Sequence, residues 1–364
     1  NLSLIGEGPA ATIIAAPATL PVSFYRDIQY LPLVYAHDAA NVVIKNLSAD
    51  GNTFESATAA FAGIAYSQAG GLVDNVKIST APNMVPYSKQ LGYGFLANAD
   101  NNTARNITLS NSTIISYQRF AAGFLGKDLT ALADGNTILG AGKTDAVTQN
   151  GVLISLQASG TIKNNTIKNF MFTGGNLTAI GIYAIDTRPV VTITGNQLTD
   201  CQTAIFCINS TGTQITQNRI VFNGSTYDDD IDYSWGILVE NGNYTVSQNE
   251  IDGRGKGTGI DAFSLANETT ILNATYNIVK NVETGISVEV DEEPGCATGE
   301  IHYNSITGAL EPLYNNQEPT AECPVPDDEC NWLGSANEDD FADTSKPSHI
   351  IGTVDYTPWL TNGT

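Results

Sequence analysis

One short phrase recurs along the chain and limits the possible folds more than any other feature. It reads apolar residue, two residues, Asn, one residue, apolar residue, as in the run from Ile215 through Asn218 to Ile220. Its asparagines are Asn46, Asn136, Asn165, Asn196, Asn218, Asn249, Asn277, Asn304 and Asn331. From Asn136 onward the copies lie roughly 22 to 31 residues apart, which is the period of a solenoid whose repeats pack on one another.

A second phrase, a small residue followed by an apolar one, opens short runs of alternating apolar residues, such as that from Gly181 to Ile185. Alternation with a period of two indicates strands with one buried face, and helical periodicity is absent over any useful length. Coils of about 25 residues with two or three short strands each predict an all-β fold. We expect a single-stranded right-handed parallel β-helix, a solenoid of about eleven coils.

The repeated asparagine has a physical role in such a coil. Stacked coils place equivalent residues about 4.8 Å apart, so Asn side chains at one turn can hydrogen-bond along a column. Asn also tolerates the left-handed backbone that a sharp corner requires.

One elongated repeat domain can reach 364 residues, because each coil needs only its neighbours. We therefore predict a single β-helix domain over residues 1–364, with an acidic loop excursion at about 312–350 before the last strand. No apolar stretch approaches the roughly 18 residues of a membrane span. The start, Asn1 to Gly6, has neither a basic nor an apolar leader, so any secretion signal is expected to lie outside this chain.

The charge is strongly acidic, with 16 Lys and Arg against 38 Asp and Glu and a formal net charge of −22. Such a charge repels phosphate backbones, so nucleic acid is not an expected partner. Solubility, a saline habitat and divalent-cation binding all remain explanations of the charge. Calcium is a possible cofactor, but no EF-hand spacing is present and the sequence predicts no metal ligands.

The repeat alignment places Cys201 and Cys207 at apolar core positions. Cys296 precedes Asn304 by the same interval as Cys323 precedes Asn331, so these two cysteines should lie on neighbouring coils. That separation suits a disulfide between Cys296 and Cys323. A Cys323–Cys330 bridge is the alternative.

Sequons for N-linked glycosylation occur along the chain, and turn asparagines followed by strand threonines also produce them by chance. The glycosylation candidates are Asn106, Asn176, Asn223, Asn243 and Asn267.

The residues also carry a resemblance. The coil phrase from Val191 to Leu198 and the opening from Leu2 to Ile14 resemble the right-handed parallel β-helix repeats of the pectin-lyase-like family. That family includes polysaccharide lyases, epimerases, polygalacturonases and large surface proteins. The C-terminal segments from Asn331 to Gly334 and from Val354 to Leu360 are similar to the last coil of the adhesin-like, secreted or cell-surface branch of this family. The resemblance implies an extracellular or cell-surface location and is specific for fold rather than for function.

The set phrases of clustered aspartates and a histidine that polygalacturonases of the family use are missing. Counted from the small-apolar phrases, Asp186, Glu240 and Glu289 fall near the ends of successive strands and form the candidate catalytic ledge. Two carboxylates about 5 Å apart could serve as acid and nucleophile or base, and a larger gap would admit water or a metal. The ligand-binding candidates beside the ledge are Tyr227, Asp230, Asp232, Tyr233 and Trp235. Ordinary solvated strand-end acids are the competing interpretation.

The leading functional prediction is an extracellular structural or adhesive protein, a rigid rod that self-associates in a surface layer, sheath or filament. Strand edges at the ends of a solenoid tend to pair with another molecule. The sequence favours a structural protein over an enzyme. The alternative is a polysaccharide-active enzyme, a lyase, epimerase or glycosidase, and the third possibility is a virion spike.

Overall fold

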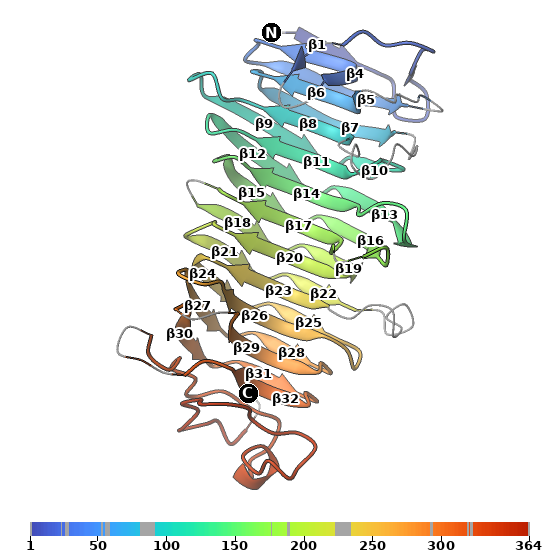
Figure 1. The fold of residues 1–364 in the computed structure, drawn as a ribbon. Helices are drawn as coiled ribbons and strands as arrows, with labels where there is room; N and C mark the ends of the chain where they lie inside the picture. Colours follow the sequence, from blue (N-terminus) through green and yellow to red (C-terminus); the bar gives the residue numbers. More distant parts are fainter. Residues whose placement is uncertain are drawn as a thin grey trace. The chain divides into compact units, whose positions relative to one another are not determined.

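The computed structural model describes residues 2–22, 24–25, 29–51, 54, 59–80, 92–175, 177–187, 190–222, 234–291, 294–318, 320 and 323–362. The chain divides into two compact units, Asn1–Val191 and Thr192–Thr364. Both units are built from short parallel strands arranged in two sheets, here called sheet I and sheet II of each unit (Figure 1). The prediction of one undivided domain over residues 1–364 stays a prediction.

In unit 1, sheet I stacks one strand per coil, and sheet II one long or two short strands per coil. The strands of sheet I, in order, are β4 (Gln29–His37), β6 (Ala60–Ser67), β8 (Tyr93–Asn98), β11 (Phe120–Leu125), β14 (Asn150–Ser155) and β17 (Ile180–Ile185). A short β3 (Phe24–Tyr25) pairs antiparallel with β4. The strands of sheet II are β1 (Leu2–Ile5), β2 (Ile13–Ala15), β5 (Val42–Asp50), β7 (Gly71–Ser79), β9 (Arg105–Ser110), β10 (Thr113–Ile115), β12 (Leu129–Asp134), β13 (Thr137–Thr144), β15 (Ser159–Lys163) and β16 (Thr166–Phe172).

Unit 2 repeats this construction. Its sheet I contains β20 (Thr203–Ile208), β23 (Trp235–Glu240), β26 (Thr258–Ser264), β29 (Thr284–Val290) and β32 (Glu311–Asn315). Its sheet II contains β18 (Val191–Thr194), β19 (Gln197–Cys201), β21 (Thr213–Thr216), β22 (Arg219–Val221), β24 (Gly242–Ser247), β25 (Glu250–Asp252), β27 (Thr269–Thr275), β28 (Ile278–Lys280), β30 (Cys296–His302) and β31 (Ser305–Thr307).

These strands confirm the predicted all-β parallel β-helix. The solenoid has about nine turns, a minor difference from the predicted count of about eleven coils, and within the described residues its sheet I contains eleven parallel strands, six in unit 1 and five in unit 2. The final predicted repeat, around Asn331, contributes only isolated bridges such as Ser305 to Trp332, so it does not add a full coil. After β32 the described chain forms further isolated bridges and a short 3-10 helix, Glu338–Asp340.

The recurring small-apolar phrase follows from packing at the corner between the sheets. A Cβ on Gly259 would lie 2.4 Å from a methyl group of Val279 in sheet II and 2.5 Å from the Gly285 carbonyl oxygen. Only glycine therefore fits where the chain enters sheet I. The next residue, Ile260, points into the core and is fully buried, which stabilises the coil by roughly 1.5–3 kcal/mol.

The asparagine column forms as predicted. In unit 2 the backbone N–H and the side-chain Nδ2 of Asn218 both donate to Oδ1 of Asn249, each at 3.0 Å. Asn249 donates in the same way to Asn277, and Asn277 to Asn304. Every such side chain is buried, so the column satisfies backbone donors that water cannot reach.

The second role predicted for these asparagines was wrong for the column. The left-handed backbone belongs to the preceding residue, as at Gln248 with φ 58° and Tyr303 with φ 58°. Asn46 is itself left-handed, with φ 55°, and its amide oxygen accepts a bond from Asn75 Nδ2 on the outer corner. Asn46 therefore occupies the corner position, because the column position needs a buried side chain and ordinary strand geometry.

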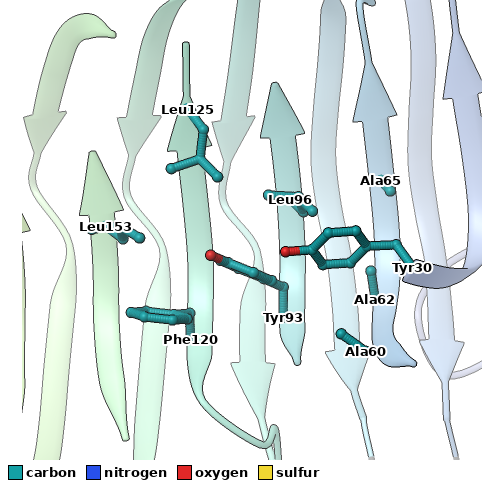
Figure 2. Packing of buried hydrophobic residues seen from close by; sticks show 9 residues of the cluster. All are labelled: Tyr30, Ala60, Ala62, Ala65, Tyr93, Leu96, Phe120, Leu125 and Leu153. Atoms are coloured by element: carbon teal, nitrogen blue, oxygen red, sulfur yellow. The ribbon is translucent and has the colours of Figure 1, made fainter. Parts of the chain in front are cut away.

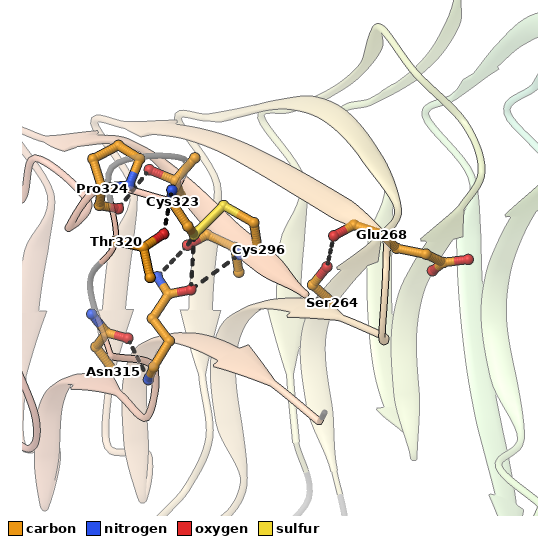
Figure 3. Close-up of a disulfide and its surroundings, with 10 residues drawn as sticks. Ser264, Glu268, Cys296, Asn315, Thr320, Cys323 and Pro324 are labelled. Atoms are coloured by element: carbon orange, nitrogen blue, oxygen red, sulfur yellow. Dashed lines mark hydrogen bonds between the residues drawn. A yellow bond between two sulfur atoms is a disulfide. The ribbon is translucent and has the colours of Figure 1, made fainter. Parts of the chain in front are cut away.

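The structure contains a disulfide between Cys296 and Cys323, with Cα atoms 5.5 Å apart (Figure 3). Cys330 is a free thiol. The bridge ties the start of β30 to the segment that follows β32. The backbone N–H of Cys323 donates to Thr320 Oγ1 at 3.0 Å. Cys201 and Cys207 are buried in the core.

Candidate active site

Four acidic residues lie on the outer face of sheet I in unit 2. We call Glu240, Asp261, Glu289 and Glu311 the carboxyl cluster. Inward isoleucines precede each of the first three along its strand, so strict alternation turns these acids away from the core. The register places Asp261 beside Ser287, and places Glu240 and Glu289 on either side of Phe263.

Asp261 is the most buried member of the cluster, with 3% of its surface exposed. Its Oδ2 accepts a hydrogen bond from Trp235 Nε1 at 2.9 Å, and its Oδ1 accepts one from the Ser287 hydroxyl at 2.7 Å. Burial raises the pKa of Asp261 to about 8, and the charge of Glu289 adds to this against the two hydrogen bonds. Burial therefore favours the protonated form of the Asp261 carboxyl, and the two hydrogen bonds that it accepts favour the ionised form.

Glu240, at the end of β23, has 8% of its surface exposed. Among the described residues its carboxyl oxygens accept no hydrogen bond. Burial raises the pKa of Glu240 to about 7, and the charge of Glu268 adds to this. Neither Glu240 carboxyl oxygen is among the fully buried side-chain atoms that lack a partner, so the carboxyl reaches the protein surface, where a ligand can meet it.

Glu289 is half-buried, and burial raises its pKa; the Ser287 hydroxyl lowers it and the charge of Glu311 raises it. Tyr314 lies on β32, beside Ser287 of β29. Burial raises the pKa of the Tyr314 phenol, and the charges of Glu289, Glu311 and Asp261 add to this. The four carboxyls therefore form one electrostatically coupled group.

The geometry allows acid-base chemistry. Glu240 and Glu289 are two strands apart in register, so their Cα atoms lie about 10 Å apart, with Phe263 between them. Carboxyl groups roughly 6.5–9.5 Å apart can act on a glycosidic bond and a water molecule together, and here such a substrate would lie over Phe263. Burial raises the pKa of both carboxyls toward neutral pH, where a carboxyl can act as an acid or as a base.

The corresponding face of unit 1 has a different composition. Its cluster of aromatic and aliphatic side chains includes Tyr30, Leu96 and Leu153, all buried (Figure 2). Tyr93 and Phe120 stack with ring centroids 5.0 Å apart. Asp186, predicted to belong to the catalytic ledge, follows β17 in this unit and is exposed. The carboxyl cluster is complete within unit 2 without it.

Two of the three predicted catalytic residues, Glu240 and Glu289, thus lie in the cluster. Trp235, predicted as a sugar-stacking face, donates its indole N–H to Asp261 and is half-buried; sugar binding by its ring stays a prediction. The other ligand-binding candidates lie outside the described residues: Tyr227, Asp230, Asp232 and Tyr233.

Sequence reasoning missed Asp261 and Glu311. The search for acidic residues considered only the position at the end of each strand that follows a small-apolar phrase. In β26 that position is occupied by Phe263, which pairs with Glu240, and Asp261 lies two residues before it. The same alternation places Asp261 on the outer face of β26, so the signal was present.

Asn106, Asn243 and Asn267 are exposed, whereas Asn176 and Asn223 lie outside the described residues; glycosylation at all five stays a prediction. Within the described part of the chain, no three His, Cys, Asp or Glu side chains are grouped as a metal site. Calcium binding stays a prediction. Within the same residues, the structure contains no helix with the length and hydrophobicity needed to cross a membrane.

Among solved structures, the chain is similar to the crystal structure of the Dettilon tailspike protein, with a TM-score of 0.57 and 13% sequence identity. The match covers 89% of this chain and 61% of the tailspike chain, so this chain spans less than two thirds of that protein. At this identity the likeness concerns the fold alone. A search of the curated proteins found no match.

The model of one protein family, described as the right-handed β-helix region, matches residues 33–220 and 150–312. Together these matches cover residues 33–312, which is most of the chain. They include β20, β23, β26 and β29 of the sheet that carries the carboxyl cluster, and the start of β32. The chain belongs to the right-handed β-helix family.

Proposed function

We propose that this chain is a glycan-hydrolysing β-helix that works outside a cell, on a cell surface or in a virion spike. The observation that carries the proposal is the buried, unpartnered Glu240 carboxyl on a strand face that also bears Asp261 and Glu289. This favours the enzymatic alternative over the purely structural role that the sequence led us to expect.

In the proposed reaction, protonated Glu240 donates its proton to the glycosidic oxygen as the bond from that oxygen to the anomeric carbon breaks. Glu289 takes a proton from a water molecule, whose oxygen forms the new bond to the anomeric carbon. Exchange with solvent then returns the proton from Glu289 to Glu240. Asp261 acts as a positioning residue, since it holds Trp235 and Ser287 and repels a charge on Glu289.

The test measures reducing-end release from a panel of polysaccharides. Glu240→Gln keeps the size of the side chain but cannot supply a proton, so the rate should fall by about 10²–10⁴-fold. Asp291→Asn, at an exposed acid just beyond β29, removes one charge outside the cluster and should leave the rate within about twofold. Equal rates for Glu240→Gln and the unchanged protein would overturn the proposal.

The pH dependence gives a second readout. Because the pKa of Glu240 is about 7, the acid form disappears as the pH rises through 7 and the rate should fall with it. The water-mediated route also inverts the anomeric centre, which product NMR detects in the first minutes of reaction. Retention would exclude this assignment of Glu289.

The proposed location rests on the fold. The tailspike similarity and the family match both support an extracellular or virion protein. We also propose self-association, because β1 and β2 expose Leu2 (68%), Ile5 (57%) and Ile13 (59%) on short strands. Exposed apolar strands tend to pair with other chains. Light scattering across protein concentrations should show a mass above that of the monomer, and a concentration-independent monomer would contradict this part of the proposal.

A further inference from the structure

The strands that carry the carboxyl cluster contain acidic residues and no basic ones. Their ionisable acids are Glu240, Asp261, Glu289 and Glu311, and the five strands of sheet I in unit 2 contain no Lys or Arg. The three strongest pKa increases of carboxyls on this face share burial as their main cause, so water screens these groups poorly.

The basic residues of unit 2 already have acidic partners elsewhere. The chain from Thr192 onward contains five Lys and Arg residues, and each lies within 4.0 Å of a carboxylate outside the cluster. The pairs are Arg219–Glu250, Lys280–Glu250, Arg254–Asp252, Lys256–Glu283 and Lys346–Asp340. None of these cations is left within unit 2 to neutralise an acidic sugar at the cluster.

The remaining surface around the cluster is aromatic and hydroxylic. Phe263 is half-buried between Glu240 and Glu289, Trp235 donates a hydrogen bond to Asp261, and Tyr314 lies beside Ser287 on the neighbouring strand. Aromatic rings bind the C–H faces of sugars, and carboxyl groups bind sugar hydroxyls, without any charge on the ligand.

We propose that the carboxyl cluster binds a neutral glycan chain rather than a polyuronate. This inference rests on the proposed function and names its substrate class. A uronate carboxylate at the site would be desolvated without a counter-ion, on a face where burial already disfavours negative charge, whereas a neutral hexose or deoxyhexose chain meets only hydrogen-bonding and stacking groups. The same charge arrangement disfavours β-elimination, which needs the substrate carboxylate to be neutralised.

The experiment compares polyuronates with their carboxyl-reduced forms, which keep linkage and most ring stereochemistry but lose the charge. We use polygalacturonate, alginate and a glucuronan, each before and after reduction, and measure binding at pH 7.5 and reducing-end release at pH 6, both in low salt. At least one reduced polymer should bind at least tenfold more tightly than its parent. Tighter binding of the parents would overturn the inference.

A charge-reversal pair provides the matched control. Glu311→Lys places a cation beside the cluster, where Glu311 now accepts a bond from the Thr284 hydroxyl at 2.9 Å. Its preference for reduced over parent polymer should fall at least fivefold. Glu300→Lys makes the same change of net charge on an exposed position of β30 in sheet II and should leave the preference within twofold. An equal fall in both variants would show a general charge effect and overturn the inference.

Failure of the proposed function gives a different pattern. If reduced polymers bind selectively but are not cleaved, and Glu240→Gln binds as the unchanged protein does, hydrolysis is wrong and the ligand class stands. If polyuronates are preferred and cleaved in a Glu240-dependent manner, hydrolysis stands and the neutral-glycan inference is wrong. If no polymer of either kind binds, both are wrong.

Discussion

The burial of Asp261 should make the stability of the protein depend on pH. The pKa of this carboxyl rises from 3.8 to about 8 in the folded protein. A group whose pKa is raised by folding binds more protons in the folded than in the unfolded state between these values. Its contribution to stability is therefore fully present below pH 3.8 and is lost as the pH rises toward 8.

The magnitude follows from the proton linkage. One pH unit is equivalent to about 1.4 kcal/mol per proton, so the free energy of unfolding should fall by up to about 4 kcal/mol between pH 5 and pH 8. The charges of Glu289 and Glu240 act on Asp261, so these three carboxyls titrate together and Asp261 alone does not release a whole proton over this range. We therefore take half of the 4 kcal/mol, about 2 kcal/mol, as the minimum fall in the free energy of unfolding.

Asp261→Asn tests this reasoning, because the amide has the size of the carboxyl but does not ionise. At pH 5 the variant should match the unchanged protein within about 1 kcal/mol, because the amide, like the protonated carboxyl, can accept from Trp235 and donate to the Ser287 hydroxyl. At pH 8 it should be more stable by about 2 kcal/mol or more. Some pH dependence will remain in the variant, because burial also raises the pKa of Glu240.

The assay is urea denaturation at both pH values, followed by tryptophan fluorescence, since Trp235 contacts Asp261 directly. Asp291→Asn is the control, because its carboxyl is exposed. Parallel pH dependence in Asp261→Asn and the unchanged protein would refute the reasoning.

Three further predictions concern the coil itself. Asn249→Leu leaves two buried donors of the preceding column asparagine without an acceptor, so urea denaturation should show a loss of about 2–5 kcal/mol. Gly299→Ala places a Cβ 1.8 Å from a backbone oxygen and should lower the melting temperature well below that of Gly255→Ala, where nothing lies within 4 Å; equal values would exclude the clash as the cause. Reduction of the Cys296–Cys323 bridge, with its sequence separation of 27, should cost roughly 3 kcal/mol and increase hydrogen exchange first in β30; unchanged exchange there would contradict this.

Much of the fold could be predicted from the sequence, because the coil repeats a few local requirements. Each repeat needs an asparagine for its unsatisfied backbone donors, a glycine where no Cβ fits, and an apolar residue behind it. Gly259, Ile260 and Asn277 satisfy these three requirements within one coil and its neighbour. The equal intervals before Asn304 and Asn331 likewise placed Cys296 next to Cys323.

The number of complete turns was less well determined. The residues around Asn331 carry half of the repeat phrase, yet they form isolated bridges and no strand. A phrase records the preference of a local segment, whereas a strand also needs a neighbouring coil of matching length to pair with.

The sequence by itself determined which residue types recur in each coil, and it placed Glu240 and Glu289 at equivalent strand-end positions. Only the tertiary structure decided that they flank Phe263 with the buried Asp261 beside them, and that the cations of unit 2 are paired elsewhere. The physical reason is that periodicity fixes the direction of a side chain within its own coil. Burial, neighbouring charges and lateral register depend on how coils separated by loops of different length stack on one another, and these set the protonation of the site.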